Sequence, residues 1–474
     1  IFVLASMWAG FSTDASSMIL ARVAQGIGGA MVLPTTLSLV NANFQGKERG
    51  IAFAVWGSTI GGMVALGPVL GGWLATDFGA DGWRLAFNIN LPLGLIVIIG
   101  LLIWVSESKQ AHRDGGIDIV GALISVVMFA TLVFGLIEGR VYGWWEASTK
   151  NAFEIGDFKW PTDGISIIPV SLAISVVFTV LFVLWERARD KAHKNVLLDL
   201  ALFKISSFRN GSFAALIISM GEFGLLFAIP LWLQNVEGLT PVSSGLVLLW
   251  LAGGAFLASG VGGALSGKLP AVRAVQIGVL FELIGVAGIS LVASTAGGWW
   301  PIAPFLLLYG IGVGLATAQL TGVIMVEVPM AKIGQASGSQ STVRQIGSAL
   351  GIAVLGTVLF TATQSAGETR IREIPFVKTA TQAQQDTFVK DISATVVDSA
   401  GAALPVISGF LTQQGMPQEV ADQVQIAASE GFTDGVKATG WAAAGFLFLG
   451  LLSTFSMGAR RRPEEKKAEV TETE

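Results

Sequence analysis

Long apolar runs, separated by shorter polar connectors, cover most of this chain. Eleven of them are long enough to cross roughly 30 Å of hydrocarbon as an α-helix, and a partial run opens the chain. Because only helices and closed barrels satisfy their backbone in lipid, the pattern predicts an all-α protein that crosses a bilayer many times. The predicted spans lie at about residues 1–11 (partial), 17–41, 50–75, 86–105, 117–137, 165–185, 209–234, 243–267, 274–294, 299–326, 341–362 and 436–457.

Composition narrows the possible functions. Of the 474 residues, 52% are hydrophobic and only 13% are charged, as in polytopic membrane proteins. The chain has no cysteine, and its two histidines, His112 and His193, lie in charged connectors. Neither a disulfide nor a metal site built on cysteine or histidine is therefore expected. A formal charge of −4 also gives no basis for binding nucleic acid.

Lysine and arginine are divided unevenly between the two alternating sets of connectors. Cytoplasmic connectors of membrane proteins are the ones rich in basic residues. The sequence therefore predicts a multi-pass protein of the plasma membrane whose C-terminal tail, 458–474, lies in the cytoplasm. The basic set consists of 42–49, 106–116, 186–209, 268–273, 327–344 and the tail.

The longest predicted external connector is 363–435. A structureless loop of this length is uncommon, and the stretches 379–399 and 417–430 have amphipathic helical spacing. We therefore expect short helices there that form a solvated cap on the outer face. The alternative is a role in capturing substrate.

The run Trp56–Ala75 is rich in glycine and contains one proline. In a soluble helix each interior glycine costs up to ~1 kcal/mol and proline ~3 kcal/mol. In a membrane, small residues four apart let two helices approach closely, and neighbouring helices compensate a proline kink. A tightly packed membrane helix is one interpretation, but the order Gly67-Pro68-x-x-Gly71-Gly72 is more specific than glycine content alone.

Four motifs, in the same order along the chain, resemble those of the 14-helix drug:proton antiporters (EmrB/QacA type) of the major facilitator superfamily. The Gly-Pro motif is similar to that of their fifth helix. The remaining motifs are Arg22, Gln25 and Gly26, similar to the Arg-bearing fourth helix; the run from Trp83 to Gly94, similar to the stretch leading into the sixth; and Arg344, Gln345 and Gly347, similar to the thirteenth.

The resemblance implies a major facilitator fold, with two six-helix bundles plus an inserted helix pair. Because the N-terminal motifs occur two spans early, we expect the first two helices to be missing from this chain, which would be an N-terminally truncated piece. The expected units are an N-terminal bundle at 1–105, the inserted pair with its connectors at 106–185, a cytoplasmic linker at 186–208, a C-terminal bundle at 209–457 and the tail at 458–474.

Three charged residues, Arg22, Glu222 and Glu282, qualify as groups at the bilayer midplane, where a charge is costly and indicates function. By resemblance, Arg22 lies on a cavity-lining helix associated with proton translocation; alternatively it bonds backbone carbonyls. Glu222 lies at the centre of its span, where a desolvated carboxyl group would exchange a proton for a cationic substrate. Its alternative is a protonated acid bonded to Ser219. Glu282 is also central, but in a peripheral helix.

The expected substrate cavity offers aromatic faces and amides to bulky cations. Its candidate residues are Phe223, Phe227, Trp232, Tyr309 and Gln319, each of which packing would equally explain. The sequence thus predicts a proton-coupled antiporter, not an enzyme. The molecules that it exports are expected to be small, lipophilic and cationic. The alternative is a facilitator of the same fold that is specific for one metabolite, peptide or siderophore. No cofactor is expected, and without a Walker-type loop ATP is not the energy source.

Overall fold

The computed structural model describes residues 1–44, 46–79, 81–105, 118–149, 151–155, 158–265, 269–329 and 332–457. The predicted connector at 106–116 and the tail at 458–474 lie outside these ranges. The described residues are helical apart from turns, connectors and one short β-hairpin, and they contain ten helices long and apolar enough to span a membrane. The predicted all-α polytopic fold is confirmed.

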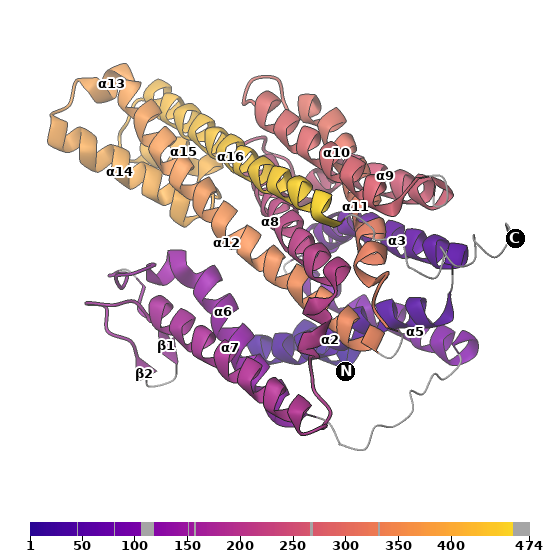
Figure 1. Ribbon diagram of the computed structural model, residues 1–474. Coiled ribbons are helices and arrows are strands. Elements are labelled where there is room, and N and C mark those ends of the chain that lie inside the picture. The colour runs from indigo at the N-terminus through magenta and orange to yellow at the C-terminus, as the bar shows by residue number, and fades with distance from the viewer. Residues whose placement is uncertain are drawn as a thin grey trace, which may run out of the picture.

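The helices follow the predicted spans closely in the first half of the chain (Figure 1). The predicted span at 86–105 is divided into two helices that meet at Ile89. The elements are α1 (Phe2–Phe11), α2 (Ala15–Asn43), α3 (Gly46–Asp77), α4 (Gly82–Asn88), α5 (Asn90–Trp104), α6 (Ile119–Tyr142), β1 (Glu154–Ile155), β2 (Phe158–Lys159) and α7 (Ile167–Lys191).

In the second half, a single apolar core connects the helices, with buried residues from Leu202 to Met457. By contrast, α5 buries none of its residues, as expected of a helix whose side chains face lipid. The elements are η1 (Leu200–Lys204), α8 (Ser206–Asn235), α9 (Pro241–Leu265), α10 (Ala271–Val292), η2 (Trp300–Ile302), α11 (Ala303–Met325), α12 (Ile333–Glu373), α13 (Pro375–Lys378), α14 (Gln382–Asp398), η4 (Leu404–Val406), α15 (Ile407–Gln413), α16 (Gln418–Thr454) and η5 (Phe455–Met457).

The segment predicted as an external loop, 363–435, is largely helical, and one prediction within it is wrong. The stretch 379–399 does form a separate helix, α14. The stretch 417–430, however, is the first part of α16, which continues without a break into the last predicted span. Helix α12 likewise runs on to Glu373, so α12 and α16 project together at the end that carries α13, α14 and α15 (Figure 1).

Ion pairs explain why these two helices continue past the apolar spans. The guanidinium of Arg370 on α12 pairs with the carboxylates of Glu430 and Asp434 on α16, the latter at 2.8 Å. Glycine allows close contact at the same level, because a Cβ at Gly431 would lie 2.7 Å from the backbone of Gly367. The two helices therefore form an antiparallel hairpin stabilised by charge as well as by packing.

Two sets of helix contacts join the N-terminal and C-terminal halves of the molecule. Helix α3 packs along α9 and also contacts α11, whereas α12 contacts both α2 and α6. In Figure 1 the α6–α7 pair lies beside α12, away from α9 and α10. Helix α12 thus borders the N-terminal helices, the α6–α7 pair and the C-terminal core. It is the helix that connects these three parts of the molecule.

Candidate functional site

An ion pair lies between two helices of the C-terminal half. Glu222, in the middle of α8, is only 5% exposed, and its Oε2 lies 3.8 Å from Nη2 of Arg344 on α12. A buried carboxylate without an opposite charge is strongly destabilising, so Arg344 accounts for an ionised Glu222 in this position. Sequence analysis assigned Glu222 and Arg344 to separate roles, but the structure brings the two side chains together.

Two glycines place Arg344 opposite Glu222. They follow Arg344 on one face of α12, three and seven residues later. A Cβ at Gly347 would lie 2.5 Å from the main-chain oxygen of Leu216, and a Cβ at Gly351 would lie 2.3 Å from that of Met220. Because backbone atoms of α8 cannot give way as a flexible side chain can, only glycine permits this approach.

A second buried carboxyl group lies beside this pair. Glu282 on α10 is 1% exposed, and its Oε2 has no hydrogen-bond partner among the described residues. It is near enough to Glu222 and Arg344 to interact electrostatically with both. The hydroxyl of Tyr309 on α11 donates to the main-chain oxygen of Glu222 at 2.8 Å. Two carboxyl groups and one guanidinium therefore form a cluster that becomes neutral on binding one proton.

A cavity of about 740 Å³ opens between α2, α6 and α12, on a different side of α12 from the acidic cluster. Ser341, Gln345 and Ala349 line it at a spacing of four residues, so they share one face of α12. Helix α12 therefore contacts the cluster through Arg344 and the cavity through this face. The described lining residues, all uncharged, are Phe2, Gly26, Gly29, Ala30, Val32, Pro34, Phe129, Val133, Ser341, Thr342, Gln345, Ile346 and Ala349.

The Arg-bearing motif of α2 belongs to a polar network in the N-terminal helices. The guanidinium of Arg22 donates to the amide oxygen of Gln25, whose amide nitrogen donates to the Ser6 hydroxyl at 3.1 Å. That hydroxyl also accepts from Asn90 and donates to the Phe87 carbonyl, so its hydrogen-bonding capacity is used. Gln25 is buried but Arg22 is exposed, so the structure does not bring Arg22 to the acidic cluster.

The five residues predicted to contact substrate do not line the cavity. Trp232 is 1% exposed, and its indole N–H donates to the Thr433 hydroxyl at 3.0 Å. Phe227 packs edge to face against Phe360 of α12. Tyr309 is fully buried beside Glu222, while Phe223 and Gln319 are half-buried. In this conformation the aromatic residues serve as packing, and contact with substrate stays a prediction.

The Gly-Pro helix, α3, makes a close contact at Gly72. A Cβ at Gly67 or Gly71 would meet nothing within 4 Å, so in this structure neither of these two glycines lies at a close helix contact. A Cβ at Gly72 would lie 2.9 Å from the backbone of Pro241, the first residue of α9. Helix α3 includes Pro68, whose side chain lies outside the described part of the structure.

Sequence reasoning missed the polar lining of the cavity. Gln345 was expected as a motif residue, but its neighbours on the same face, Ser341 and Ala349, carried no motif. The available signal was their four-residue spacing within an apolar span, which predicts a mildly polar helix face. A mildly polar face of this kind can either pack against another helix or line a cavity. Only the structure, which shows the cavity, distinguishes these two roles.

Comparison with known proteins gives consistent results. Residues 1–352 match the profile of the Major Facilitator Superfamily. The chain is 28% identical to the "Probable actinorhodin transporter" of Streptomyces coelicolor, over 98% of the chain and 80% of that protein. It is 32% identical to the "Multidrug resistance protein Stp" of Mycobacterium tuberculosis and 29% identical to the "Tetracenomycin C resistance and export protein" of Streptomyces glaucescens. Each of these two matches covers 76% of the chain and 62% of the relative.

A solved structure shows the same fold. It is that of a bacterial homologue of the human lysosomal transporter Spinster, in an inward-facing and unoccupied conformation. The TM-score is 0.51 at 16% sequence identity, and the match covers 97% of this chain and 83% of that one. With its membrane-length helices and its family match over residues 1–352, this chain belongs to the Major Facilitator Superfamily and is a membrane transporter, not an enzyme.

Proposed function

We propose that this protein exports lipophilic small molecules in exchange for protons. The observation that carries the proposal is the cluster that the buried Glu222 and Glu282 form with the half-buried Arg344, next to a cavity that shares helix α12 with it. Buried ionisable groups within membrane helices are costly and are retained for ion or substrate pathways. A cluster that is one positive charge short of neutral is suited to bind and release a proton.

Helix α12 provides the physical connection between proton and substrate. A proton on the cluster removes the negative charge that Arg344 attracts, which weakens the contact between α12 and α8. The same helix presents Ser341 and Gln345 to the cavity, so a shift of α12 changes the shape of the cavity. In facilitators, two bundles rock around a central site, and a ligand drives that change only through unequal affinity for the two states.

The relatives support the substrate class. Those named above are, by their names, transporters or resistance proteins for antibiotics and other drugs. The cavity fits such compounds in size, since ligand pockets typically measure roughly 300–1,000 Å³. Its described lining is uncharged, so the preference for cations belongs to the carboxyl groups and not to the cavity wall.

We further propose the 14-helix organisation for the whole protein, with α6 and α7 as the helix pair between the bundles. In support, α6 and α7 pack on each other and α6 contacts α12, as an inserted pair would. We also propose that the C-terminus lies in the cytoplasm, on the basis of the basic connectors.

Transport in proteoliposomes tests the proposed function. A pH gradient that is acidic on the side to which the protein exports should drive movement of the fluorescent cation ethidium toward that side. Glu222→Gln should abolish this movement. Glu419→Gln provides the matched control, because Glu419 is exposed on the first turn of α16. Movement that is equal in wild type and in Glu222→Gln would contradict the role of the cluster.

A further inference from the structure

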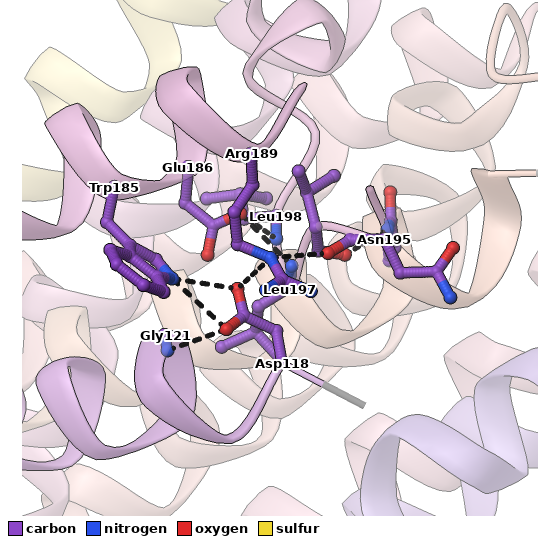
Figure 2. Close-up of polar contacts among 10 residues, drawn as sticks. Asp118, Gly121, Trp185, Glu186, Arg189, Asn195, Leu197 and Leu198 are labelled. Carbon is purple, nitrogen blue, oxygen red and sulfur yellow. Dashed lines mark hydrogen bonds and ion pairs between the residues drawn. The ribbon is translucent and has the colours of Figure 1, made fainter. Parts of the chain in front are cut away.

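A second group of charged residues, separate from the cluster around Glu222, lies where α6 begins and α7 ends. Figure 2 shows Asp118 at the start of α6 facing Trp185, Glu186 and Arg189 on the last turns of α7. Both carboxylates are buried, Asp118 at 4% exposure and Glu186 at 1%. Glu186 directly follows the span predicted at 165–185, on the side predicted to be cytoplasmic.

The carboxylate of Asp118 is well supplied with donors. It accepts from the backbone N–H of Gly121 at 2.9 Å and from the indole N–H of Trp185 at 3.1 Å, and it pairs with Nε of Arg189 at 3.2 Å. These contacts hold the Asp118 side chain in place at the start of α6, because hydrogen bonds to a charged group are stronger than those between neutral groups. Nε of Arg189 also donates a hydrogen bond to the main-chain oxygen of Asn195 at 2.8 Å, so Arg189 links Asp118 to the connector that follows α7.

Only one of the two carboxylate oxygens of Glu186 has hydrogen-bond partners among the described residues. Its Oε2 accepts from the backbone N–H groups of Leu197 and Leu198 in the connector that follows α7 (Figure 2). Its Oε1 is buried and has no hydrogen-bond partner among the described residues. An ionised carboxylate with a bare buried oxygen is costly, because burial removes the water that would solvate it.

The unpartnered oxygen lies close to Asp118. A Cβ placed on Gly121 would be 2.6 Å from Oδ2 of Asp118 and 2.7 Å from Oε1 of Glu186, so both oxygens lie against the same point on α6. Among the described residues, Asp118 and Arg189 are the charged groups that interact electrostatically with Glu186, so two carboxylates and one guanidinium meet there. The connector contributes backbone N–H groups from Leu197 and Leu198.

We propose that Glu186 is a proton-binding site, in which Oε1 carries the proton and donates it toward the carboxylate of Asp118. The proton supplies the missing donor and balances the second negative charge. Loss of the proton sets two carboxylates against each other and separates the start of α6 from the end of α7.

The proton at Glu186 also affects α12. The connector that bonds Glu186 is attached to the beginning of α12 by two contacts: the Gln335 amide donates to the Val196 carbonyl at 2.9 Å, and Lys332 pairs with Asp199. A change at the ends of α6 and α7 therefore reaches the helix that carries Arg344 and lines the cavity. Glu186 binds its proton from the side of the membrane on which it lies, and this binding does not require the proposed export cycle to operate.

Infrared spectroscopy of the purified protein in detergent tests the proposal without any transport. The carbonyl band of a protonated carboxylic acid should decrease as pH is raised, and Glu186→Gln should lack that component. The matched control, Glu419→Gln, should retain it. An unchanged band in Glu186→Gln would overturn the proposal.

Two further variants keep the test decisive if Glu186→Gln folds poorly. Asp118→Asn removes the negative neighbour, so the band should be lost at lower pH than in wild type; an unshifted titration would overturn the proposal. Glu186→Gln should also melt at the wild-type temperature, since an amide both accepts from Leu197 and donates to Asp118. Glu186→Ala should melt several degrees below the wild-type temperature. An equal fall in melting temperature for Glu186→Gln and Glu186→Ala would show that a proton on Glu186 does not stabilise this contact.

Discussion

Replacing Gly351 with alanine would place a methyl carbon 2.3 Å from the main-chain oxygen of Met220, and Gly347→Ala would place one 2.5 Å from that of Leu216. Ordinary contact begins near 3.4 Å, so α12 and α8 would have to separate by about 1 Å at either position. Both atoms struck belong to the backbone of a helix, and no rotamer change relieves the clash.

The cost can be worked out against a matched substitution. Overpacking of this kind costs about 1–3 kcal/mol, whereas alanine is about 1 kcal/mol more favourable than glycine within a helix. Gly67→Ala on α3 gains the same helix propensity but meets nothing within 4 Å. The difference between Gly351→Ala and Gly67→Ala therefore isolates the clash, at about 1–3 kcal/mol.

The ion pair adds a functional consequence. At an effective dielectric constant of about 20, charges 3.8 Å apart attract by about 4 kcal/mol, and about 1 Å of extra separation weakens that by about 1 kcal/mol. Gly347→Ala, one turn from Arg344, should therefore impair transport more than Gly351→Ala at equal loss of stability.

Thermal unfolding in detergent, followed by the fluorescence of the fourteen tryptophans, measures the first effect. Gly347→Ala and Gly351→Ala should melt below Gly67→Ala, by an amount that corresponds to about 1–3 kcal/mol, and Gly67→Ala should melt at or above the wild-type temperature. Melting of Gly351→Ala at the same temperature as Gly67→Ala would refute the close α8–α12 contact on which the site depends.

Three other changes test separate parts of the account. Arg344→Met leaves Glu222 buried without its partner and should destabilise the protein by about 3–5 kcal/mol; the double variant with Glu222→Leu should recover much of that loss in melting temperature, and no recovery would argue against the pair. Ser341→Leu narrows the cavity and should weaken ethidium binding at least tenfold in a fluorescence titration. Trp232→Phe should lower the melting temperature and leave ethidium binding unchanged. Weaker binding in Trp232→Phe but not in Ser341→Leu would indicate a substrate site near α8 in place of the cavity. Arg140→Ala removes a guanidinium that lies 3.8 Å from the centroid of the Phe360 ring and donates to the Val397 carbonyl. Hydrogen exchange of the backbone amides in α14 should therefore become faster. An equal increase in Lys159→Ala would show that the Arg140 contact does not stabilise α14.

Hydropathy predicted the membrane helices well, because a span must be apolar along its whole length whatever surrounds it. The helices outside the apolar spans were harder to predict. The continuation of α12 and α16 depends on Arg370 pairing with Glu430 and Asp434, which are sixty or more residues away in the chain. A sequence pattern shows that each stretch is amphipathic, but it does not show that the two stretches are continuous with their neighbouring spans.

The candidate site was predicted in pieces. Glu222 and Glu282 stood out because carboxyl groups are rare within apolar spans, and Arg344 stood out through its motif. Their proximity follows from the packing of α8, α10 and α12, which no local pattern encodes. Glu186 was not predicted at all, because a glutamate at the end of a span has the same sequence context as one in solvent; its burial comes from Asp118 and the connector folding over it.

Proton movement driven by substrate tests the central claim most directly. Proteoliposomes are loaded with ethidium without an initial pH gradient, and a pH-sensitive dye reports the interior as ethidium leaves. The account predicts that protons enter as ethidium exits in the wild type and in Glu419→Gln, and that neither moves in Glu222→Gln. Ethidium efflux from wild-type vesicles with no change of interior pH would contradict it.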